Sequence, residues 1–259
     1  MLKLNGKVIE QNHFPDGTLL MKHYEESYGV FENIEWFYEN DAELFALICL
    51  KNSLGDRKVH LYMPYIPHAR MDRVKNKEDI FTLKYFCEII NSLNFASVRV
   101  FDPHSDVAPA LLNRVKVDTP EALINYVVDK IDPENTLYYY PDAGAAKRYS
   151  SMISAPYTYG NKIRDWDTGK IKGLTIVDPA LVNGKDVLII DDICSRGGTF
   201  YHSAKALKNA GAENIYLYVT HCENTILEGE LLTSGLIEKV YTTNSIFTKE
   251  HEKIEVFKL

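Results

Sequence analysis

The residues best suited to chemistry lie between positions 187 and 200, where an apolar run ends in two acids and a glycine-containing loop follows. Residues 187–190 are typical of a strand that is buried on both faces, and residues 198–209 have the apolar spacing of a helix that packs on a sheet. The loop between them therefore follows the carboxyl end of a strand. Open α/β sheets bind ligands at that position.

The side chains of this loop predict which ligand it binds. Gly197 and Gly198 permit a tight, left-handed backbone that turns N–H groups toward an anion, and the start of a helix adds its dipole. Thr199 adds a hydroxyl donor, while Asp191 and Asp192 can accept hydrogen bonds from ribose hydroxyls. This combination predicts a site for a phosphorylated sugar. The alternative is a strand that happens to end in acids before a glycine turn.

The same segment resembles the phosphoribosyl pyrophosphate binding motif of type I phosphoribosyltransferases and of ribose-phosphate pyrophosphokinases. That motif has two acids, two variable residues and then Asp-Thr-Gly-Gly-Thr or a close variant, and Ser195 and Arg196 replace its Asp-Thr pair here. The resemblance implies that the sugar phosphate is bound by Asp191, Asp192, Ser195, Arg196, Gly197, Gly198 and Thr199.

Composition restricts the class of protein. The chain has 259 residues, 46% of them apolar, which is enough for one large or two ordinary buried cores. Its start lacks the apolar core of a signal peptide, and no stretch approaches the roughly 18 uncharged residues that a membrane span needs. We therefore expect a cytoplasmic protein with no membrane partner. The four cysteines are scattered without metal-ligand spacing, which argues against structural zinc and disulfides.

The formal net charge of −7 argues against a nucleic-acid partner, whose binding surface would be basic. A polyanionic substrate then needs local positive charge. A divalent cation could supply it, together with a cluster of basic residues that could equally be a solvated face: Lys147, Arg148, Lys162, Arg164, Lys170 and Lys172.

Strand-like and helix-like runs alternate along the chain, which predicts an α/β fold. Strands are expected at 59–63, 98–102, 136–140, 187–191 and 215–219, and helices at 42–54, 80–93, 120–130 and 198–210. With the resemblance, this predicts two similar phosphoribosyltransferase-like domains, each a mostly parallel sheet flanked by helices. The expected boundaries are 1–122 for an ATP-binding domain and 123–259 for a sugar-phosphate-binding domain, with residues 248–259 as candidates for packing back on the first.

Three motifs of the first half could bind a second substrate. HFPDG at 13–17 is by itself typical of a hairpin turn. PHARMDR at 67–73 follows a strand and contains Arg70, Asp72 and Arg73, where a guanidinium can bind phosphate through two hydrogen bonds. FDPHSD at 101–106 sets His104 between two acids after the next strand, where a lone histidine is more often a loop residue than a ligand.

In order and spacing, these three motifs resemble the F-x-D-G-E, A-R-Q-D-R-K and D-L-H-A segments of ribose-phosphate pyrophosphokinases. Thr18, Met71 and Val74 stand where that family has Glu, Gln and Lys. The resemblance implies that His104 is also catalytic, because it helps to position magnesium and the triphosphate. It implies an ATP site formed by Phe14, Asp16, Arg70, Asp72 and His104.

The second half continues the resemblance. YYYPDAGAAKR at 138–148 resembles the family's P-D-x-G segment, which implies that Asp142 joins His104 as a magnesium residue and that Gly144 allows close approach. One carboxylate and substrate phosphates are enough for Mg²⁺. TYGNKIRDWDTGK at 158–170 is by itself typical of a solvated loop, but it resembles the family's mobile catalytic loop, which implies catalytic roles for Lys162 and Arg164.

The resemblance covers about residues 8–247 and implies a diphosphokinase. In this reaction the anomeric hydroxyl of a ribose 5-phosphate unit attacks the β-phosphorus of Mg²⁺-ATP, giving a 1-diphosphate and AMP. ADP-ribose is a second possible acceptor, because Arg196 makes the phosphate loop more cationic. A phosphoribosyltransferase that consumes the 1-diphosphate, or a non-catalytic relative that senses a ligand, would also fit a loop of this kind. Because the family's ATP site borrows the F-x-D-G turn from a neighbouring subunit, the resemblance also implies a homo-oligomer.

Overall fold

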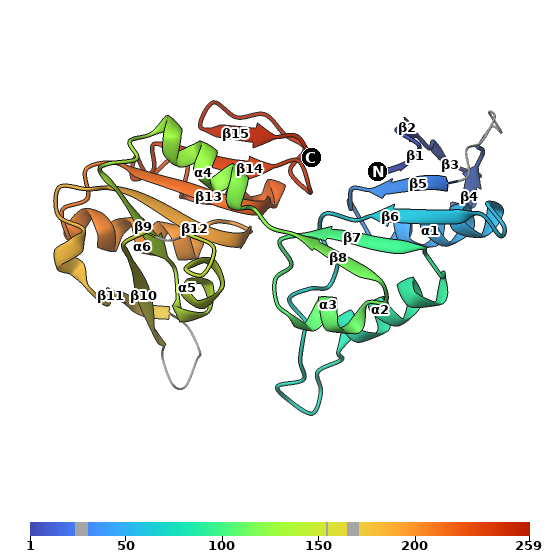
Figure 1. Ribbon diagram of the computed structural model, residues 1–259, viewed down its shortest axis with the longest axis horizontal. Coiled ribbons are helices and arrows are strands. Elements are labelled where there is room, and N and C mark those ends of the chain that lie inside the picture. The colour runs from blue at the N-terminus through green and yellow to red at the C-terminus, as the bar shows by residue number, and fades with distance from the viewer. Residues whose placement is uncertain (24–30, 154, 165–170) are drawn as a thin grey trace. The chain divides into compact units, whose positions relative to one another are not determined.

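The computed structural model describes residues 1–23, 31–153, 155–164 and 171–259, with the backbone alone described at 162–164 and 171–173. The chain forms two compact units, Met1–Thr119 and Pro120–Leu259, each with its own sheet and core. The predicted α/β fold is confirmed, with mostly parallel sheets flanked by helices (Figure 1). Within the described residues, no helix combines the length and the apolar character that crossing a bilayer requires.

The N-terminal unit contains a six-stranded sheet in the order β2-β1-β5-β6-β7-β8. Its central strands run parallel, whereas β1 is antiparallel to both of its neighbours. The strands are β1 (Leu2–Leu4), β2 (Lys7–Val8), β5 (Phe31–Trp36), β6 (Lys58–Tyr62), β7 (Ser97–Phe101) and β8 (Val115–Asp118). The helices are α1 (Ala42–Ser53), α2 (Thr82–Ser92) and α3 (Val107–Leu111), and all three lie on one face of the sheet (Figure 1).

Helical spacing explains how α2 packs on this sheet. Leu83, Phe86, Cys87 and Ile90 recur at the period of one helical face, and all four are buried in the core of the unit. The helix was expected to begin at residue 80, but Ile80 precedes it and is 64% exposed. The helix therefore begins later than its apolar pattern predicted.

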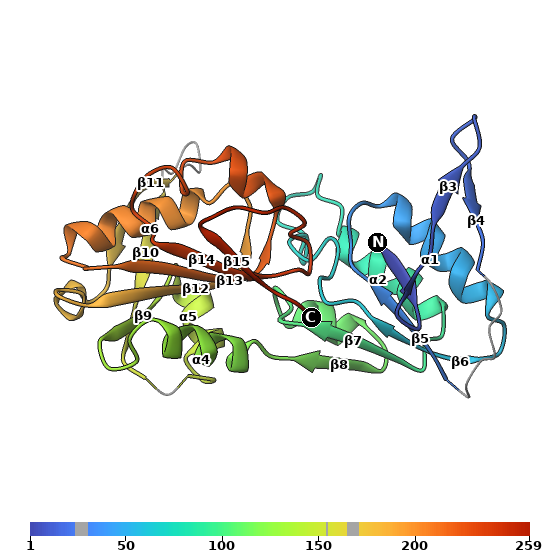
Figure 2. The same ribbon diagram turned by 90° about the horizontal axis from the view of Figure 1, so that it is seen from above.

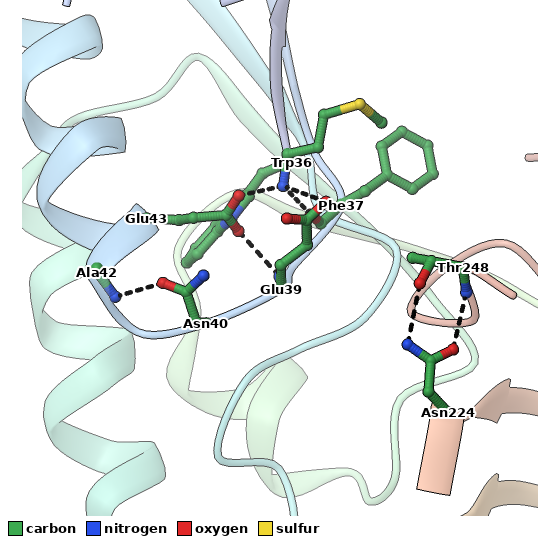
Figure 3. A network of polar contacts seen from close by, with 9 residues as sticks. Trp36, Phe37, Glu39, Asn40, Ala42, Glu43, Asn224 and Thr248 are labelled. Atoms are coloured by element: carbon green, nitrogen blue, oxygen red, sulfur yellow. Dashed lines mark hydrogen bonds and ion pairs between the residues drawn. The ribbon is translucent and has the colours of Figure 1, made fainter. Parts of the chain in front are cut away.

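A buried carboxylate fixes the start of α1 against the end of β5 (Figure 3). Glu43 Oε2 accepts hydrogen bonds from Trp36 Nε1 and from the N–H of Glu39, both at 2.9 Å, and Oε1 pairs with the amino group of Met1. Because these donors satisfy the carboxylate, Glu43 can lie in the core at 4% exposure.

A separate two-stranded sheet precedes β5. β3 (Gln11–His13) pairs with β4 (Leu19–Met21) in antiparallel register, and residues 14–18 form the connecting turn. The hairpin turn predicted at 13–17 is thus confirmed. Figure 2 shows this hairpin extending beyond the larger sheet.

The C-terminal unit contains a seven-stranded sheet in the order β11-β10-β9-β12-β13-β14-β15, parallel except for β11. Its strands are β9 (Thr136–Tyr140), β10 (Tyr157–Arg164), β11 (Ile171–Ile176), β12 (Asp186–Cys194), β13 (Ile215–Cys222), β14 (Lys239–Thr243) and β15 (Ile254–Phe257). Its helices are α4 (Glu121–Lys130), α5 (Ala143–Tyr149) and α6 (Gly198–Asn209), with short 3₁₀ turns η1 (Pro179–Leu181) and η2 (Asn224–Glu228).

Helices cover both faces of this second sheet. Side chains of α4 and α5 share one core with Leu188 and Ile190, whereas side chains of α6 share the other with Val187 and Ile189. These four β12 residues are completely buried, as their uninterrupted apolar run predicted.

The strand order reverses direction between β9 and β12. From β9 the chain passes through α5 to β10 on one side, and β12 then pairs with the other side of β9 before α6 leads to β13. Ligands of open α/β sheets bind at the carboxyl ends of strands at such a reversal.

The C-terminal end of the chain belongs to the second sheet. There β15 pairs in parallel with β14 and becomes the edge strand. Pairing satisfies the backbone hydrogen bonds of this short strand within its own unit. That residues 248–259 also pack on the N-terminal domain stays a prediction.

Candidate active site

Asp142 follows β9 at the strand reversal and caps the start of α5. Its Oδ1 accepts the N–H groups of Gly144 at 3.0 Å and Ala145 at 3.1 Å. A side chain at Gly144 would place its Cβ 3.2 Å from that same oxygen, so the glycine gives the carboxylate room. The cap holds the Asp142 carboxylate in a defined orientation.

Asp191 and Asp192 lie near the carboxyl end of the neighbouring strand, β12. Asp192 Oδ1 is 3.4 Å from Nη1 of Arg148 on α5, and the N–H of Asp192 donates to Asp191 Oδ1 at 3.0 Å. Desolvation raises the pKa of Asp191 well above its usual value, and the charges of Asp192 and Asp142 act in the same direction. The structure therefore brings the three predicted acids into one neighbourhood.

These carboxylates fit a hard divalent cation. The like charges of Asp142 and Asp191 disfavour their joint ionisation, and a bound cation would relieve that repulsion. Among the described residues, no three His, Cys, Asp or Glu side chains are arranged as a preformed metal site. Mg²⁺ commonly uses only one or two protein carboxylates and completes its coordination with water and substrate phosphates.

The predicted phosphate loop leads into α6 through a left-handed glycine. Gly197 has φ of +79°, as its sequence context predicted, and it precedes the helix without providing a side-chain cap. Gly198 and Thr199 form the first residues of α6. Helix-start N–H groups that side chains do not cap are typical of anion-binding sites.

Ser195 and Arg196 make their contacts with the segment that follows β13. Ser195 Oγ donates to Glu223 Oε2 at 2.8 Å. Arg196 Nη2 is 3.0 Å from Glu228 Oε2, with 71% and 58% of the two side chains exposed. The seven predicted sugar-phosphate residues therefore lie along the end of β12, the following loop and the start of α6, and Ser195 and Arg196 have partners in the segment after β13.

Sequence reasoning missed this second segment. A Cβ at Gly229 would lie 1.9 Å from the carbonyl oxygen of Arg196, and a Cβ at Gly197 would lie 3.0 Å from the side chain of Leu231. Residues 223–231 therefore pack directly on the phosphate loop. Gly229 was the one available signal, and a single glycine in a polar stretch does not reveal its partner.

Lys162 and Arg164 lie on β10 instead of in the solvated loop that their sequence context by itself suggested. β10 pairs with β11, with Lys162 opposite Leu174 and Arg164 opposite Ile171. The side chains of both residues lie outside the described part of the chain, as do residues 165–170.

Gly160 explains where β10 runs. A Cβ there would lie 2.4 Å from the Tyr139 hydroxyl and 2.8 Å from the Pro141 carbonyl oxygen, so only a glycine permits this approach. The contact sets β10 beside the residue that precedes Asp142. The backbone of Lys162, a predicted catalytic residue, lies two residues beyond this contact.

In the N-terminal unit, the loops after β6 and β7 bring Asp72 and His104 together. Arg73 Nε and Nη2 donate to the two oxygens of the buried Asp72 at 2.7 and 3.2 Å. This pairing lowers the pKa of Asp72, and the neighbouring Ser105 and His104 act in the same direction. Adjacent parallel strands therefore place these two predicted ATP residues side by side, with Arg70 exposed on the same loop.

Both loops contain backbone conformations that non-glycine residues rarely adopt. His68 has φ of +63° and Asp102 has φ of +42°. Such conformations cost free energy and concentrate at functional sites. Asn5, Asn94 and Arg114 share this left-handed conformation outside the two motifs, so it does not by itself mark a site.

The remaining predicted ATP residues lie on the β3–β4 hairpin. Phe14 is 50% exposed, and Asp16 Oδ1 accepts the N–H and the hydroxyl of Thr18 at 2.9 and 2.7 Å. These bonds, first of all that of the Thr18 hydroxyl, lower the pKa of Asp16. Thr18 thus stabilises the turn, and Gly17 and Thr18 border a pocket of about 690 Å³.

Cys194 is a structural residue. It lies opposite Cys222 in the β12–β13 register, and both are completely buried. A hydrogen bond with Cys222 and burial raise the pKa of the Cys194 thiol. A protonated thiol is a poor nucleophile, so the helix start does not activate this cysteine.

Comparison with known proteins agrees with this geometry. Residues 144–231 match the phosphoribosyl transferase domain family. The ribose-phosphate pyrophosphokinase of Pyrococcus abyssi is 29% identical over 259 residues, covering 96% of this chain and 87% of that protein. That of Sulfurisphaera tokodaii is 27% identical over 248 residues, covering 92% and 84%. The chain is therefore similar to ribose-phosphate pyrophosphokinases over more than nine-tenths of its length.

A solved structure has the same fold as this chain. The phosphoribosylpyrophosphate synthetase from Mycobacterium smegmatis superposes with a TM-score of 0.80 and is 18% identical. The match covers 97% of this chain and 86% of that one, so the two proteins share their fold over nearly the whole chain.

Proposed function

We propose that the protein is a diphosphokinase that transfers the β,γ-pyrophosphoryl group of Mg²⁺-ATP to the anomeric hydroxyl of a ribose 5-phosphate unit. The products are a 1-diphosphate and AMP. The observation that carries this proposal is the meeting of Asp142 and Asp191 with the start of α6 at the strand reversal of the second sheet. The names of the relatives support the same reaction.

The acceptor side of the reaction follows from the β12–α6 loop. Asp191 and Asp192 would accept hydrogen bonds from the ribose hydroxyls, and the N–H groups at the start of α6 would bind the phosphate, with Thr199 adding its hydroxyl. The carboxylates would bind the hydroxyls of the sugar, and the N–H donors would bind its phosphate. This arrangement orients the anomeric hydroxyl with respect to the loop.

The donor side belongs to the N-terminal unit. Phe14, Asp16, Arg70, Asp72 and His104 would bind ATP by resemblance to the family. The neighbouring positions of Asp72 and His104 support this assignment. Lys162 and Arg164 would stabilise charge that develops on the departing AMP, since phosphoryl-type transfer depends on alignment and charge neutralisation.

His104 and Asp142 would hold Mg²⁺, whose chemistry here is to neutralise phosphate charge. Asp142, which lies near Asp191, offers the carboxylate oxygen that Mg²⁺ prefers. A homo-oligomer and a cytoplasmic location without nucleic-acid or membrane partners belong to the same proposal and rest on the family resemblance and the acidic composition.

ADP-ribose is the second candidate acceptor. The exposed ion pair of Arg196 with Glu228 contributes only about 0 to 1 kcal/mol, so a ligand phosphate could readily take the place of Glu228. A guanidinium can bridge the two phosphates of a diphosphate-linked ribose. The position of Arg196 therefore supports ADP-ribose as a second candidate acceptor.

The proposal is tested by incubating the protein with Mg²⁺-ATP and each candidate acceptor and measuring AMP. We expect AMP with ribose 5-phosphate, ADP-ribose or both, and a 1-diphosphate in equal amount. Consumption of phosphoribosyl pyrophosphate with a nucleobase would instead establish a phosphoribosyltransferase. Ligand binding with no turnover in any mixture would establish a sensing role.

A further inference from the structure

The phosphate loop lacks an acid at the position where the family motif has one. The motif reads Asp-Thr-Gly-Gly-Thr after its two variable residues, and Ser195 stands at the position of that Asp. In the structure, a carboxylate nevertheless lies beside this position. Glu223 Oε2 accepts the Ser195 hydroxyl at 2.8 Å.

Strand register brings Glu223 to this place. β12 and β13 run parallel with Cys194 opposite Cys222, so the residues after them emerge side by side. The N–H of Glu223 donates to the Cys194 carbonyl oxygen at 2.8 Å, which extends the pairing beyond the strands. The contact between Glu223 and Ser195 is therefore a consequence of the sheet and not of a chance side-chain rotamer.

Neighbouring hydroxyls hold the carboxylate in one position. Thr225 Oγ1 donates to the same Glu223 oxygen at 3.0 Å and lies 3.3 Å from Ser195 Oγ. Hydrogen bonds to a charged acceptor are stronger than those between neutral groups. The three side chains form a closed set of contacts between the phosphate loop and the segment after β13.

The segment that carries Glu223 is itself fixed. Asn224 Nδ2 donates to Thr248 Oγ1 at 2.9 Å, and the N–H of Thr248 donates back to Asn224 Oδ1 at 3.0 Å (Figure 3). At its other end, Gly229 packs on the Arg196 carbonyl oxygen. A rigid support is what a loop needs if it is to hold a ligand in a defined geometry.

We propose that Glu223 supplies, from the adjacent strand, the carboxylate that the family motif carries at position 195. Glu223 is then a positioning residue that fixes Ser195, and with it the turn into α6 that binds the acceptor phosphate. This inference rests on the proposed function, because it assigns Glu223 a role in that same sugar-phosphate site.

Exchanging the hydroxyl of position 195 and the carboxylate of position 223 tests the proposal. We expect Glu223→Ala to raise the KM of the acceptor by about 10- to 100-fold, the effect of a lost charge-assisted hydrogen bond, with the KM of ATP changed by less than about 2-fold. Ser195→Asp alone should be similarly impaired, because it sets two carboxylates at hydrogen-bonding distance. The double variant Ser195→Asp/Glu223→Ser should recover to within about 3-fold of the wild type.

Glu230→Ala is the matched control, since this exposed glutamate lies on the same segment, and it should leave both KM values unchanged. A double variant no better than the worse single variant would overturn the proposal. So would a Glu223→Ala variant whose two KM values rise equally as its melting temperature falls, because that result indicates general destabilisation.

Calorimetric titration of the same proteins with ribose 5-phosphate separates this inference from the reaction. If the wild type binds but no acceptor yields AMP, the proposed function fails, and the order of the affinities still decides the role of Glu223. We expect that order to follow the KM values. Absence of wild-type binding both to ribose 5-phosphate and, in a parallel titration, to ADP-ribose would overturn both proposals.

Discussion

Two adjacent aspartates of the candidate site have different surroundings. Asp192 is buried beside Arg148, which compensates its charge. Asp191 is desolvated among like charges, which raises its pKa. An acid whose folded-state pKa is raised costs stability once it ionises. Asp191, a residue of the proposed sugar-phosphate site, is therefore expected to lower the stability of the ligand-free fold.

Replacing Asp191 with Asn should accordingly stabilise the protein while weakening acceptor binding. At pH 7.5 we expect the melting temperature to rise by roughly 2–4 °C, the shift that about 1 kcal/mol produces in a chain of this size. Because the wild-type penalty disappears as pH falls toward the unfolded-state pKa of about 3.9, the two proteins should converge near pH 4. Thermal melts at both pH values, with acceptor KM measured at pH 7.5, test this. A destabilised variant at pH 7.5 would contradict it.

Arg196 distinguishes the two candidate acceptors. Its exposed pairing with Glu228 predicts that Arg196→Thr changes the use of ribose 5-phosphate little. If ADP-ribose is the acceptor, the same change should lower its kcat/KM by about 10- to 100-fold, because charge-assisted bonds to the diphosphate are lost. The measurement is the rate of AMP release from ATP with each of the two acceptors. An identical small effect on both would exclude the diphosphate-bridging role.

Strand β10 connects the acid cluster with the predicted catalytic residues. Its Gly160 lies against Tyr139 and Pro141, immediately before Asp142. Pairing with β11 continues as far as Arg164, with a register shift between Ile163 and Arg164. The placement of this strand therefore determines the backbone positions of Lys162 and Arg164.

Gly160→Ala should displace this strand without unfolding the unit. The added Cβ would meet the buried Tyr139 hydroxyl and a backbone oxygen, so β10 must move. Because a displacement of about 1 Å can cost 100-fold, we expect turnover to fall by about 10- to 100-fold with little change in the KM of ATP. Lys162→Ala and Arg164→Ala should reproduce this pattern with a loss above about 100-fold. A Gly160→Ala variant with wild-type turnover would show that β10 tolerates the shift.

The two units differ in how their sheets are covered. The C-terminal sheet has a helix-covered core on each face. The N-terminal sheet has helices on one face (Figure 1). Side chains that alternate with its buried residues, such as Phe31, His60 and Arg99, are exposed or half-buried. Parallel sheets are usually covered on both faces. The C-terminal unit therefore buries both faces of its sheet with its own helices, and the N-terminal unit does so on one face.

Residues 120–259 should consequently fold when they are produced alone. Their cores are built from their own α4, α5, α6 and sheet, and the final strand pairs within the unit. We expect a cooperative thermal transition by circular dichroism and retained binding of ribose 5-phosphate. A broad, non-cooperative melt would show that this unit depends on residues 1–119.

Local sequence patterns were sufficient for the elements and for part of the site. The apolar run of β12, the helical spacing of α2 and α6 and the left-handed Gly197 all depend on residues within a few positions of one another. The order of acids and glycines therefore predicted correctly a loop between a strand, β12, and a helix, α6. Periodicity and backbone freedom are local properties, so they can be read along the chain.

The contacts that complete the site depend on strand register and packing between distant segments. Ser195 meets Glu223 from 28 positions away because β12 and β13 are aligned. Arg148 reaches Asp192 because α5 packs beside β12, and the last strand joined β14 although the sequence left it free to pack elsewhere. Many registers satisfy the same local periodicity, and the packing of a whole sheet selects among them. For this reason tertiary structure, and not the local motif, determined that the Glu223 carboxylate lies beside Ser195.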